Sequence, residues 1–148
     1  MNTAVDPRFH GKLLVCDKAA FLEDVRAIRL GHVVNALEAP VLPYAFQCSF
    51  FVKLLYLPMT RTVDYHIELI DAEGEFLAAP PPVAVRNSRG ADQIPGADTF
   101  ADITFVACEP GNVTAQLVVD GVVVDRYPIT IRTAPNRRAP DGEGDDER

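Results

Sequence analysis

Apolar and polar side chains alternate along much of this chain, and a period of two residues is typical of β-strands that bury one face. The longest alternating run covers residues 46–56 and predicts the strongest strand. Its expected core face consists of Phe46, Cys48, Phe50, Val52, Leu54 and Tyr56. Residues 63–69 alternate in the same way, with Asp64, His66 and Glu68 on the face predicted to meet water. The pattern therefore predicts a mainly β protein.

Shorter patterns predict the rest of the elements. Further strands are expected over 12–17, 28–37, 75–77, 83–85 and 99–108, and prolines at 40, 43 and 80–82 interrupt the ladder between some of them. The first of these strands is apolar on both faces, so we expect both faces to be buried. Within 18–26, Phe21, Leu22 and Val25 have the spacing i, i+1 and i+4, which predicts one short helical turn packed on a sheet.

Residues 113–131 predict the last hairpin, with its turn at Asp120-Gly121. A two-residue loop would place the apolar residues of 127–131 on the polar face of the preceding strand, which makes a poor core. A three-residue loop, Val119-Asp120-Gly121 with Gly121 in the left-handed conformation, shifts the register by one residue. The core face then unites Val113, Ala115, Leu117, Val123, Tyr127, Ile129 and Ile131. We therefore expect the three-residue loop, which leaves Asp125 unfavourably opposite Ala115.

Composition divides the chain into three parts. Its 148 residues, 48 % hydrophobic and 24 % charged, are typical of one soluble domain. We place that domain at residues 12–133, after a loose leader over residues 1–11. Residues 134–148 are rich in proline, glycine and charge, which predicts a disordered acidic tail.

Charge and cysteine use limit the classes of partner. The formal net charge of −7 argues against a basic footprint for nucleic acid or anionic lipid. No apolar run approaches the roughly 20 residues that span a bilayer, and the start of the chain lacks the pattern of a signal peptide. The three cysteines are an odd number without a Cys-x-x-Cys pair, so we interpret them as reduced thiols packed like small hydrophobes. We expect a cytoplasmic protein that contacts neither nucleic acid nor membrane.

Four short stretches carry a resemblance to a known family: Leu-Val-Cys-Asp at 14–17, Ile-Glu-Leu-Ile-Asp-Ala-Glu-Gly at 67–74, Pro-Gly-Asn-Val at 110–113 and Leu-Val-Val-Asp-Gly at 117–121. Together they resemble an uncharacterised bacterial β-sandwich family, a domain of unknown function, over about residues 12–132. The resemblance implies an immunoglobulin-like sandwich without a known activity, ligand or catalytic residue. We therefore expect an all-β, immunoglobulin-like two-sheet antiparallel β-sandwich of seven to nine strands, with one short helical turn.

Two groups of side chains point to chemistry, and each has a simpler interpretation. Asp71, Glu73 and Glu75 surround Gly74 as in part of a calcium loop, but the full ligand spacing of an EF-hand is missing, so we prefer a solvated turn. His66 lies between two carboxylates on one strand face, which suits a proton-transfer or metal site, or a surface charge ladder. We prefer the ladder. No residue is assigned a catalytic, cofactor-binding or metal-binding role, and no cofactor is expected.

Surplus apolar surface is the strongest functional signal. Phe51 and Leu55 lie on the outer face of the 46–56 strand, where either the Phe21 segment or another subunit must cover them. The irregular stretch 80–97, with Arg86 and Arg89, is either a recognition loop or simple disorder. We expect a non-enzymatic binding or assembly module with a protein partner or self-association, quite possibly as a homodimer. The alternative is a metal-dependent or hydrolytic domain that uses the loop carboxylates and His66.

Overall fold

The computed structural model describes residues 10–24, 27–57 and 60–134, and within these residues it contains eleven strands and no helix. The strands are β1 (His10–Cys16), β2 (Ala19–Leu22), β3 (Ala27–Leu30), β4 (Ala36–Ala39), β5 (Tyr44–Leu55), β6 (Val63–Ile70), β7 (Phe76–Ala78), β8 (Val83–Val85), β9 (Gly96–Ala107), β10 (Gly111–Val119) and β11 (Val122–Thr133). The prediction of an all-β protein is confirmed. The number of strands exceeds the predicted seven to nine because short segments pair at the margins of the sheets.

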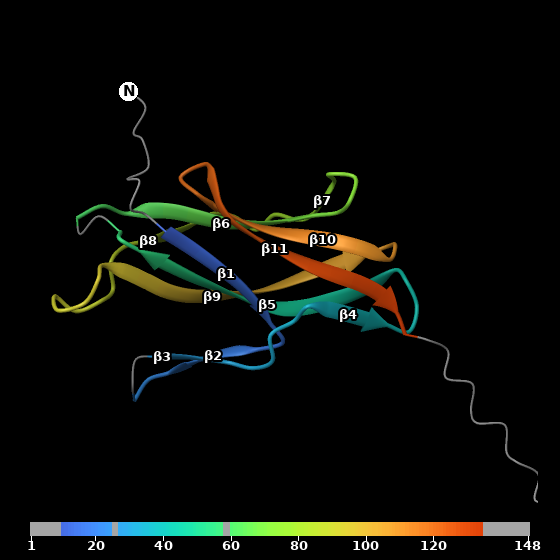
Figure 1. Cartoon of the computed structure of the whole chain (residues 1–148), viewed down its shortest axis with the longest axis horizontal. Helices are drawn as coiled ribbons and strands as arrows, with labels where there is room; N and C mark the ends of the chain where they lie inside the picture. Colours follow the sequence, from blue (N-terminus) through green and yellow to red (C-terminus); the bar gives the residue numbers. More distant parts are fainter. Residues whose placement is uncertain (1–9, 25–26, 58–59, 135–148) are drawn as a thin grey trace, which may run out of the picture.

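Two main sheets face each other across the core (Figure 1). One sheet has the order β1-β5-β9 and is antiparallel throughout. The other has the order β4-β11-β10-β6-β7, and β8 also pairs with β6. The pairs are antiparallel except β4 with β11, which are parallel. The inner faces of both sheets contribute to one continuous apolar cluster, so the core lies between the two layers.

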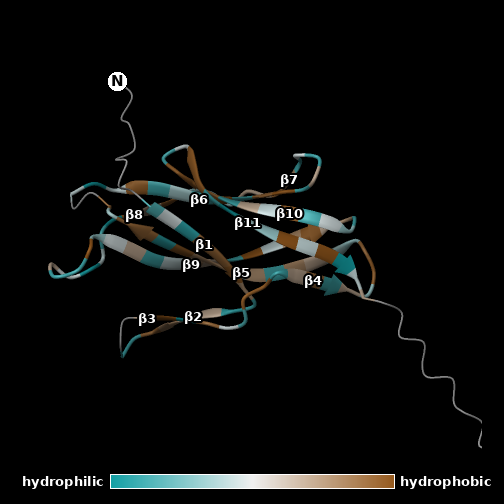
Figure 2. Ribbon diagram, in the orientation of Figure 1, coloured by the Kyte–Doolittle hydropathy of each residue, from teal (hydrophilic) through white to brown (hydrophobic). Residues whose placement is uncertain are grey.

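The long alternating run of β5 behaves as its pattern predicts, with one exception. Phe46, Cys48, Phe50, Val52 and Leu54 are buried. Tyr56, expected on the same face, is instead 41 % exposed, because β5 ends at Leu55 and the backbone turns away with a φ of 61° at Tyr56. The same alternation is visible as bands of contrasting hydropathy along β10 and β11 (Figure 2).

The β10–β11 hairpin has the predicted core face except at Val123, in whose place Val124 packs against the core, and it has a different turn. Val119 pairs with Val122 across a two-residue loop, Asp120-Gly121, in which both residues have positive φ, 47° and 81°. This loop type matches the twist of its strands, which explains why it displaces the predicted three-residue loop. A bulge next to Leu117 then restores the parity, so that Ala115 faces Tyr127 and Asp125 lies opposite Leu117 rather than Ala115. Val123, expected on the core face, pairs with Val118.

The predicted helical turn at 18–26 is wrong: the segment forms a β-hairpin. Phe21 pairs with Ile28 and Ala19 with Leu30, which makes β2–β3 a separate two-stranded sheet. Aromatic and β-branched side chains that pair across two strands favour this arrangement over a helix too short to be stable. Val25, which completed the expected helical stripe, lies outside the described residues.

The predicted strand at 28–37 is divided. β3 ends at Leu30 and β4 begins only at Ala36, because the chain between them turns back to the edge of β1, where the Val34 amide donates to the Val15 carbonyl at 2.8 Å. At the start of the chain, β1 begins at His10, inside the expected leader, whose residues 1–9 lie outside the described part. Residues 135–148 of the expected tail also lie outside it. Nothing in the described ranges is a helix long and apolar enough to cross a membrane.

Candidate functional site

The outer face of the β1-β5-β9 sheet is organised as rows of side chains that run across the three strands. From one end to the other, the rows are Lys12–Lys53–Asp98, Leu14–Phe51–Phe100 and Cys16–Ser49–Asp102. A charged row, an apolar row and a polar row therefore follow one another. The middle row contains Phe51, which the sequence analysis placed on the outer face of the 46–56 strand.

The β2–β3 hairpin lies over this face and covers part of it. The Phe21 ring contacts the Phe100 ring, with centroids 5.0 Å apart and planes inclined by 40°. Cys16 and Ser49 of the polar row are buried, and the Ser49 hydroxyl donates to the Asp102 carboxylate at 2.5 Å. Phe21 itself is 62 % exposed. The hairpin thus packs on the apolar row at Phe100 but leaves its own aromatic ring open to solvent. Cover of Phe51 and Leu55 by this segment or by another subunit stays a prediction.

The base of the hairpin is clamped by Asp17 and His32. The Asp17 amide donates to the His32 carbonyl at 3.0 Å, and the His32 amide donates to Asp17 Oδ1 at 2.7 Å. The His32 ring lies 3.1 Å from Asp17 Oδ2. Hydrogen bonds from the His32 ring and amide lower the pKa of Asp17. A side chain at Gly31 would meet Asp17 Oδ1 at 2.1 Å, so the clamp requires glycine there.

Opposite the hairpin tip, residues 87–96 form a loop closed at its base. The Asn87 side-chain oxygen accepts hydrogen bonds from the Arg89 amide at 3.1 Å and from the Gly96 amide at 2.9 Å. The Ser88 amide donates to the Gly96 carbonyl at 2.9 Å, and the Gln93 amide to the Gly90 carbonyl at 3.0 Å. Part of the irregular stretch 80–97 therefore has a defined, internally bonded conformation.

Arg89 and Lys53 share one carboxylate between this loop and the sheet. An Arg89 terminal nitrogen lies 3.0 Å from Asp98 Oδ1, and Lys53 Nζ lies 3.3 Å from the same oxygen. Arg89 also donates to the Ile94 carbonyl at 3.4 Å, and its side chain is only 17 % exposed. Because a guanidinium has five N–H donors and an ammonium three, both cations keep unused donors. Asp98 therefore holds the two cations side by side at the edge of the sheet.

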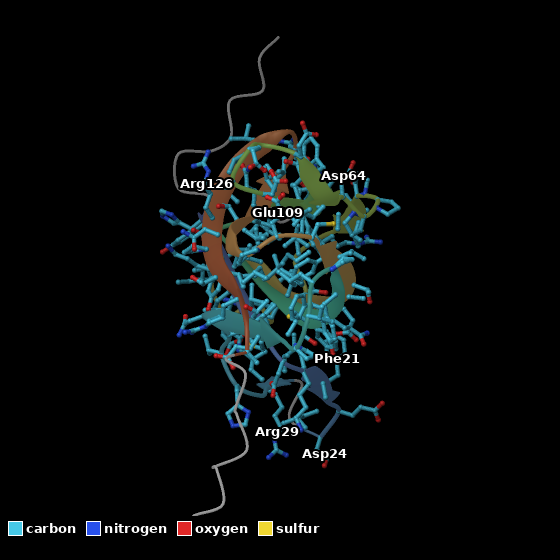
Figure 3. All side chains as sticks on the ribbon, turned by 90° about the vertical axis from the view of Figure 1, so that its right-hand side faces the viewer. Phe21, Asp24, Arg29, Asp64, Glu109 and Arg126 are labelled. Atoms are coloured by element: carbon cyan, nitrogen blue, oxygen red, sulfur yellow. The ribbon has the colours of Figure 1, made fainter. Side chains whose placement is uncertain are left out.

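Between the hairpin and the 87–96 loop lies an open groove of about 1180 Å³. Its lining residues are Phe21, Leu22, Glu23, Ile28, Lys53, Ser88, Arg89, Gly90, Gln93, Ile94 and Asp98. Figure 3 shows Phe21 and Asp24 on the hairpin that projects beyond the two main sheets. Three features that the sequence marked separately meet here: the Phe21 segment, the Arg89 loop and the outer face of β5. We call this site the hairpin groove.

Of the four predicted interface residues, Arg89 lines the hairpin groove, whereas Phe51, Leu55 and Arg86 do not. Arg86 follows β8 and is exposed, outside the residues that line the hairpin groove. Leu55 is half-buried at the end of β5, between His10 and Gly96 of the neighbouring strands. Leu22, Ile28 and Ile94 are groove residues that sequence reasoning missed as site members. Their signal was weak, because a lone apolar residue in a short strand or loop is common on protein surfaces.

The residues of the enzymatic alternative are occupied by local contacts. His66 Nε2 lies 2.9 Å from Glu68 Oε1 on the same strand. Asp71 Oδ1 accepts hydrogen bonds from the Glu73 and Glu75 amides at 3.0 and 2.9 Å, which fixes the turn. In the described part of the chain, no group of three or more histidine, cysteine or acidic side chains is arranged to hold a metal ion.

The cysteines divide into two kinds. Cys16 and Cys48 are buried, and burial raises the pKa of both thiols, that of Cys48 to about 11. Cys108, just after β9, is exposed, so the prediction of three packed thiols is wrong for this residue. It borders a second hollow, of about 370 Å³, beside the Asp71 turn.

The fold and the site define an all-β protein whose open groove combines apolar walls with two fixed cations. No protein-family model and no curated protein matches the chain. Among solved structures, it is similar to the alkylpurine DNA glycosylase AlkC of Pseudomonas fluorescens bound to DNA containing an abasic site analog, with 12 % sequence identity and a TM-score of 0.35. That similarity covers 66 % of this chain and 28 % of the glycosylase chain.

Proposed function

We propose that this protein is a non-enzymatic binding module that recognises a polypeptide in the hairpin groove. The observation that carries the proposal is the exposed Phe21 ring beside two cations held by one carboxylate. Aromatic side chains and arginine are the residue types that most often dominate protein–protein binding energy. Their position on a loop and a hairpin above a paired sheet is typical of recognition sites.

The dimensions of the groove favour a polypeptide over a small ligand. Small-molecule sites are usually enclosed and occupy about 300–1,000 Å³, whereas this groove is open and reaches about 1180 Å³. Its apolar walls offer surface to bury, and its cations offer donors to a carboxylate or a backbone carbonyl. An extended segment with apolar side chains satisfies both requirements.

The enzymatic alternative has less support. The Asp71 carboxylate accepts hydrogen bonds from two backbone amides of its own turn. The His66 ring contacts Glu68 on the same strand. The cytoplasmic location, the absence of nucleic-acid and membrane partners, and the resemblance to the immunoglobulin-like family of unknown function stay predictions from the sequence.

A random peptide library, panned against the immobilised protein at a concentration below about 1 µM, tests the proposal. The groove variant is Phe21→Ser/Leu22→Ser. The matched control is Val122→Ser, because Val122 is an apolar residue that is 46 % exposed at the tip of the β10–β11 hairpin. We expect enriched peptides that bind the wild type and the control but lose at least about tenfold in affinity for the groove variant, which is about 1.4 kcal/mol. Enrichment of no peptide, or of peptides that bind all three proteins equally, overturns the proposal.

A further inference from the structure

We infer that the free edge of β9 pairs antiparallel with β9 of a second copy of this chain, which joins two three-stranded sheets into one. This edge is distinct from the hairpin groove, so the inference does not depend on the proposed function. Three observations carry it: unpaired backbone groups along β9, the lack of features that protect an edge strand, and a strand sequence that matches itself in one register.

The backbone of β9 presents a run of hydrogen-bonding groups on the side away from β5. The Gly96 amide donates to Asn87 Oδ1 and the Gly96 carbonyl accepts from the Ser88 amide, both at 2.9 Å, so both groups of Gly96 point away from β5. Because β9 keeps one register with β5 from Gly96 to Ala107, every second residue repeats this orientation. The residues that repeat it are Asp98, Phe100, Asp102, Thr104 and Val106. Among the described residues, no hydrogen bond engages their amides or carbonyls.

The other margins of the two sheets are short or already engaged. On the opposite edge of the same sheet, the Leu13 amide of β1 donates to Asp125, and the Val15 carbonyl accepts from the Val34 amide. β4, β7 and β8 have only three or four residues each. β7 approaches β9 from the facing sheet, but its strand partner is β6. The long open edge of the described structure is therefore that of β9.

β9 also lacks the usual protection of an edge strand. Natural edge strands are blunted by prolines, bulges or charged side chains, and a long edge without them is a template for pairing with another chain. β9 has 12 residues, no proline and no bulge against β5. Beyond Asp98, its one charged side chain is Asp102, whose carboxylate accepts a hydrogen bond from Ser49 at 2.5 Å. The other outward side chains are uncharged, and Val106 is 48 % exposed.

One register of β9 with itself joins like side chains across the two copies. Antiparallel pairing of two identical strands has a twofold axis, and the residue on that axis defines the register. With Ile103 on the axis, Phe100 lies opposite Val106 of the second copy, and Asp102 lies opposite Thr104 of the second copy. The apolar row that ends at Phe100 then continues into an apolar side chain. The polar row that ends at Asp102 continues into a hydroxyl that can donate to its carboxylate.

Neighbouring registers are less favourable, and Asp102 distinguishes them. An axis at Asp102 itself places two carboxylates opposite each other, and an axis at Phe100 places Asp98 opposite Asp102. An axis at Ala101 or Thr104 places Asp102 opposite an apolar side chain. A second copy therefore supplies a complementary strand when Ile103 is on the axis. Because the β1 edge is engaged, the assembly closes at two copies.

Light scattering coupled to size exclusion, at about 100 µM protein, measures the number of copies. The edge variant is Thr104→Pro, which removes an amide that points away from β5 and therefore leaves the β5 ladder intact. The matched control, Thr104→Val, keeps the amide and a β-branched side chain. We expect the wild type and the control to be dimers and Thr104→Pro to be a monomer, because proline removes a hydrogen bond on each side of the axis.

Opposite charges at the same position test the register. Because Thr104 lies opposite Asp102 of the second copy, Thr104→Lys should lower the dissociation constant of the dimer and Thr104→Asp should raise it, each by about threefold or more at low salt. Thr130→Lys and Thr130→Asp make the same changes of charge on an exposed position of β11 and should leave the dissociation constant unchanged. All four variants keep their backbone donors, so they decide the question if thermal unfolding shows that Thr104→Pro does not fold.

Hydrogen exchange locates the interface. The Asp102 and Thr104 amides should become protected as the protein concentration rises from about 10 to 500 µM, because they gain partners only in the dimer. A monomeric wild type, a folded Thr104→Pro that remains dimeric, equal effects of Thr104→Lys and Thr104→Asp, unprotected amides at these two positions in the dimer, or growth beyond two copies each overturns the inference. The peptide test of the hairpin groove has a separate readout, so either result can fail without the other.

Discussion

The carboxylate of Asp125 on β11 accepts a hydrogen bond from the backbone amide of Leu13 on β1, at 2.8 Å and across 112 positions of the chain. β1 is the edge strand of its sheet, so this amide has no strand partner on that side. The bulge next to Leu117 brings Asp125 to this edge. An acidic residue that looked unfavourable near the core therefore satisfies a backbone donor and links the two sheets.

Replacing Asp125 should weaken this link. Asp125→Ala leaves the Leu13 amide without its acceptor, and we expect the free energy of unfolding to fall by about 1–3 kcal/mol. Asp125→Asn keeps an acceptor oxygen and should lose less. Urea denaturation measures both, with Glu109→Ala as an exposed acidic control. Equal midpoints for Asp125→Ala and the control would contradict a role for this bond.

Gly96 should not tolerate a side chain. A Cβ at this position would lie 2.2 Å from the Leu54 carbonyl oxygen, a backbone atom of the paired strand, and 3.3 Å from the Arg89 guanidinium. We expect Gly96→Ala to cost about 1–3 kcal/mol of stability and to displace Arg89. Gly90→Ala is the matched control, because its nearest neighbour is the movable end of the Asp92 side chain. Chemical denaturation of the two variants should separate them, and similar stabilities would refute the steric argument.

The Asp17–His32 clamp predicts a dependence on acid. Since hydrogen bonds from His32 lower the pKa of Asp17 in the folded state, the clamp stabilises the fold above the unfolded value of 3.8 and loses this effect as pH falls below it. His32→Ala removes the ring but not the backbone amide, so the midpoint of the Asp17 titration should move part of the way up. Carbon-detected NMR of the Asp17 carboxyl measures it. His66→Ala, on β6, should leave the midpoint unchanged, and an unchanged midpoint in His32→Ala would exclude a contribution of the His32 ring to the clamp.

The thiols should react in a fixed order. At pH 8 an aromatic disulfide reagent should modify exposed Cys108 within seconds to minutes, whereas Cys16 and Cys48 should react only after unfolding. Mass spectrometry of partly labelled protein identifies the residue. Rapid native labelling of Cys48 would show that the β5 core opens far more often than its burial indicates.

Alkaline pH should destabilise the fold through Cys48. Its folded pKa is about 11 against an ordinary 9.0, so its contribution is fully present below pH 9 and is lost as pH rises towards 11. By pH 11 the loss should be on the order of 2 kcal/mol. Unfolding free energies between these pH values should fall more steeply for the wild type than for Cys48→Ala. Because Tyr65 and Tyr127 also have raised pKa values, the comparison with the variant isolates the thiol. Parallel curves would contradict the assignment.

The strands that bury one face were predictable because local alternation and burial agree along them. β6 and β9 follow their patterns, and β8 forms the edge strand expected from Val83 and Val85. In the last hairpin, parity placed the core face correctly except at Val123, because it could not locate the extra residue. A bulge in the turn and a bulge within the strand shift the register equally, and the choice depends on backbone twist and on the bond that Asp125 makes.

The hairpin groove was less predictable because its parts come from distant positions. Phe21, Lys53 and Arg89 belong to three separate segments that meet only through strand pairing. The apolar spacing of 18–26 fits one helical turn as well as two short strands, since a window this short contains barely one period of either. The structure shows two strands, because Phe21 pairs with Ile28. The sequence between these residues contains no standard turn motif that would have predicted this pairing.

The Asn87 side chain, by joining both ends of the 87–96 loop, separates the tip of that loop from the framework beneath it. Residues added between Gly90 and Gln93 would lengthen a segment whose ends are already fixed, and the entropic cost of such insertions grows slowly with length. New specificities can therefore be grafted at this tip while β9 keeps its alignment with β5. In engineered variants of this protein, insertions should therefore be best tolerated between Gly90 and Gln93.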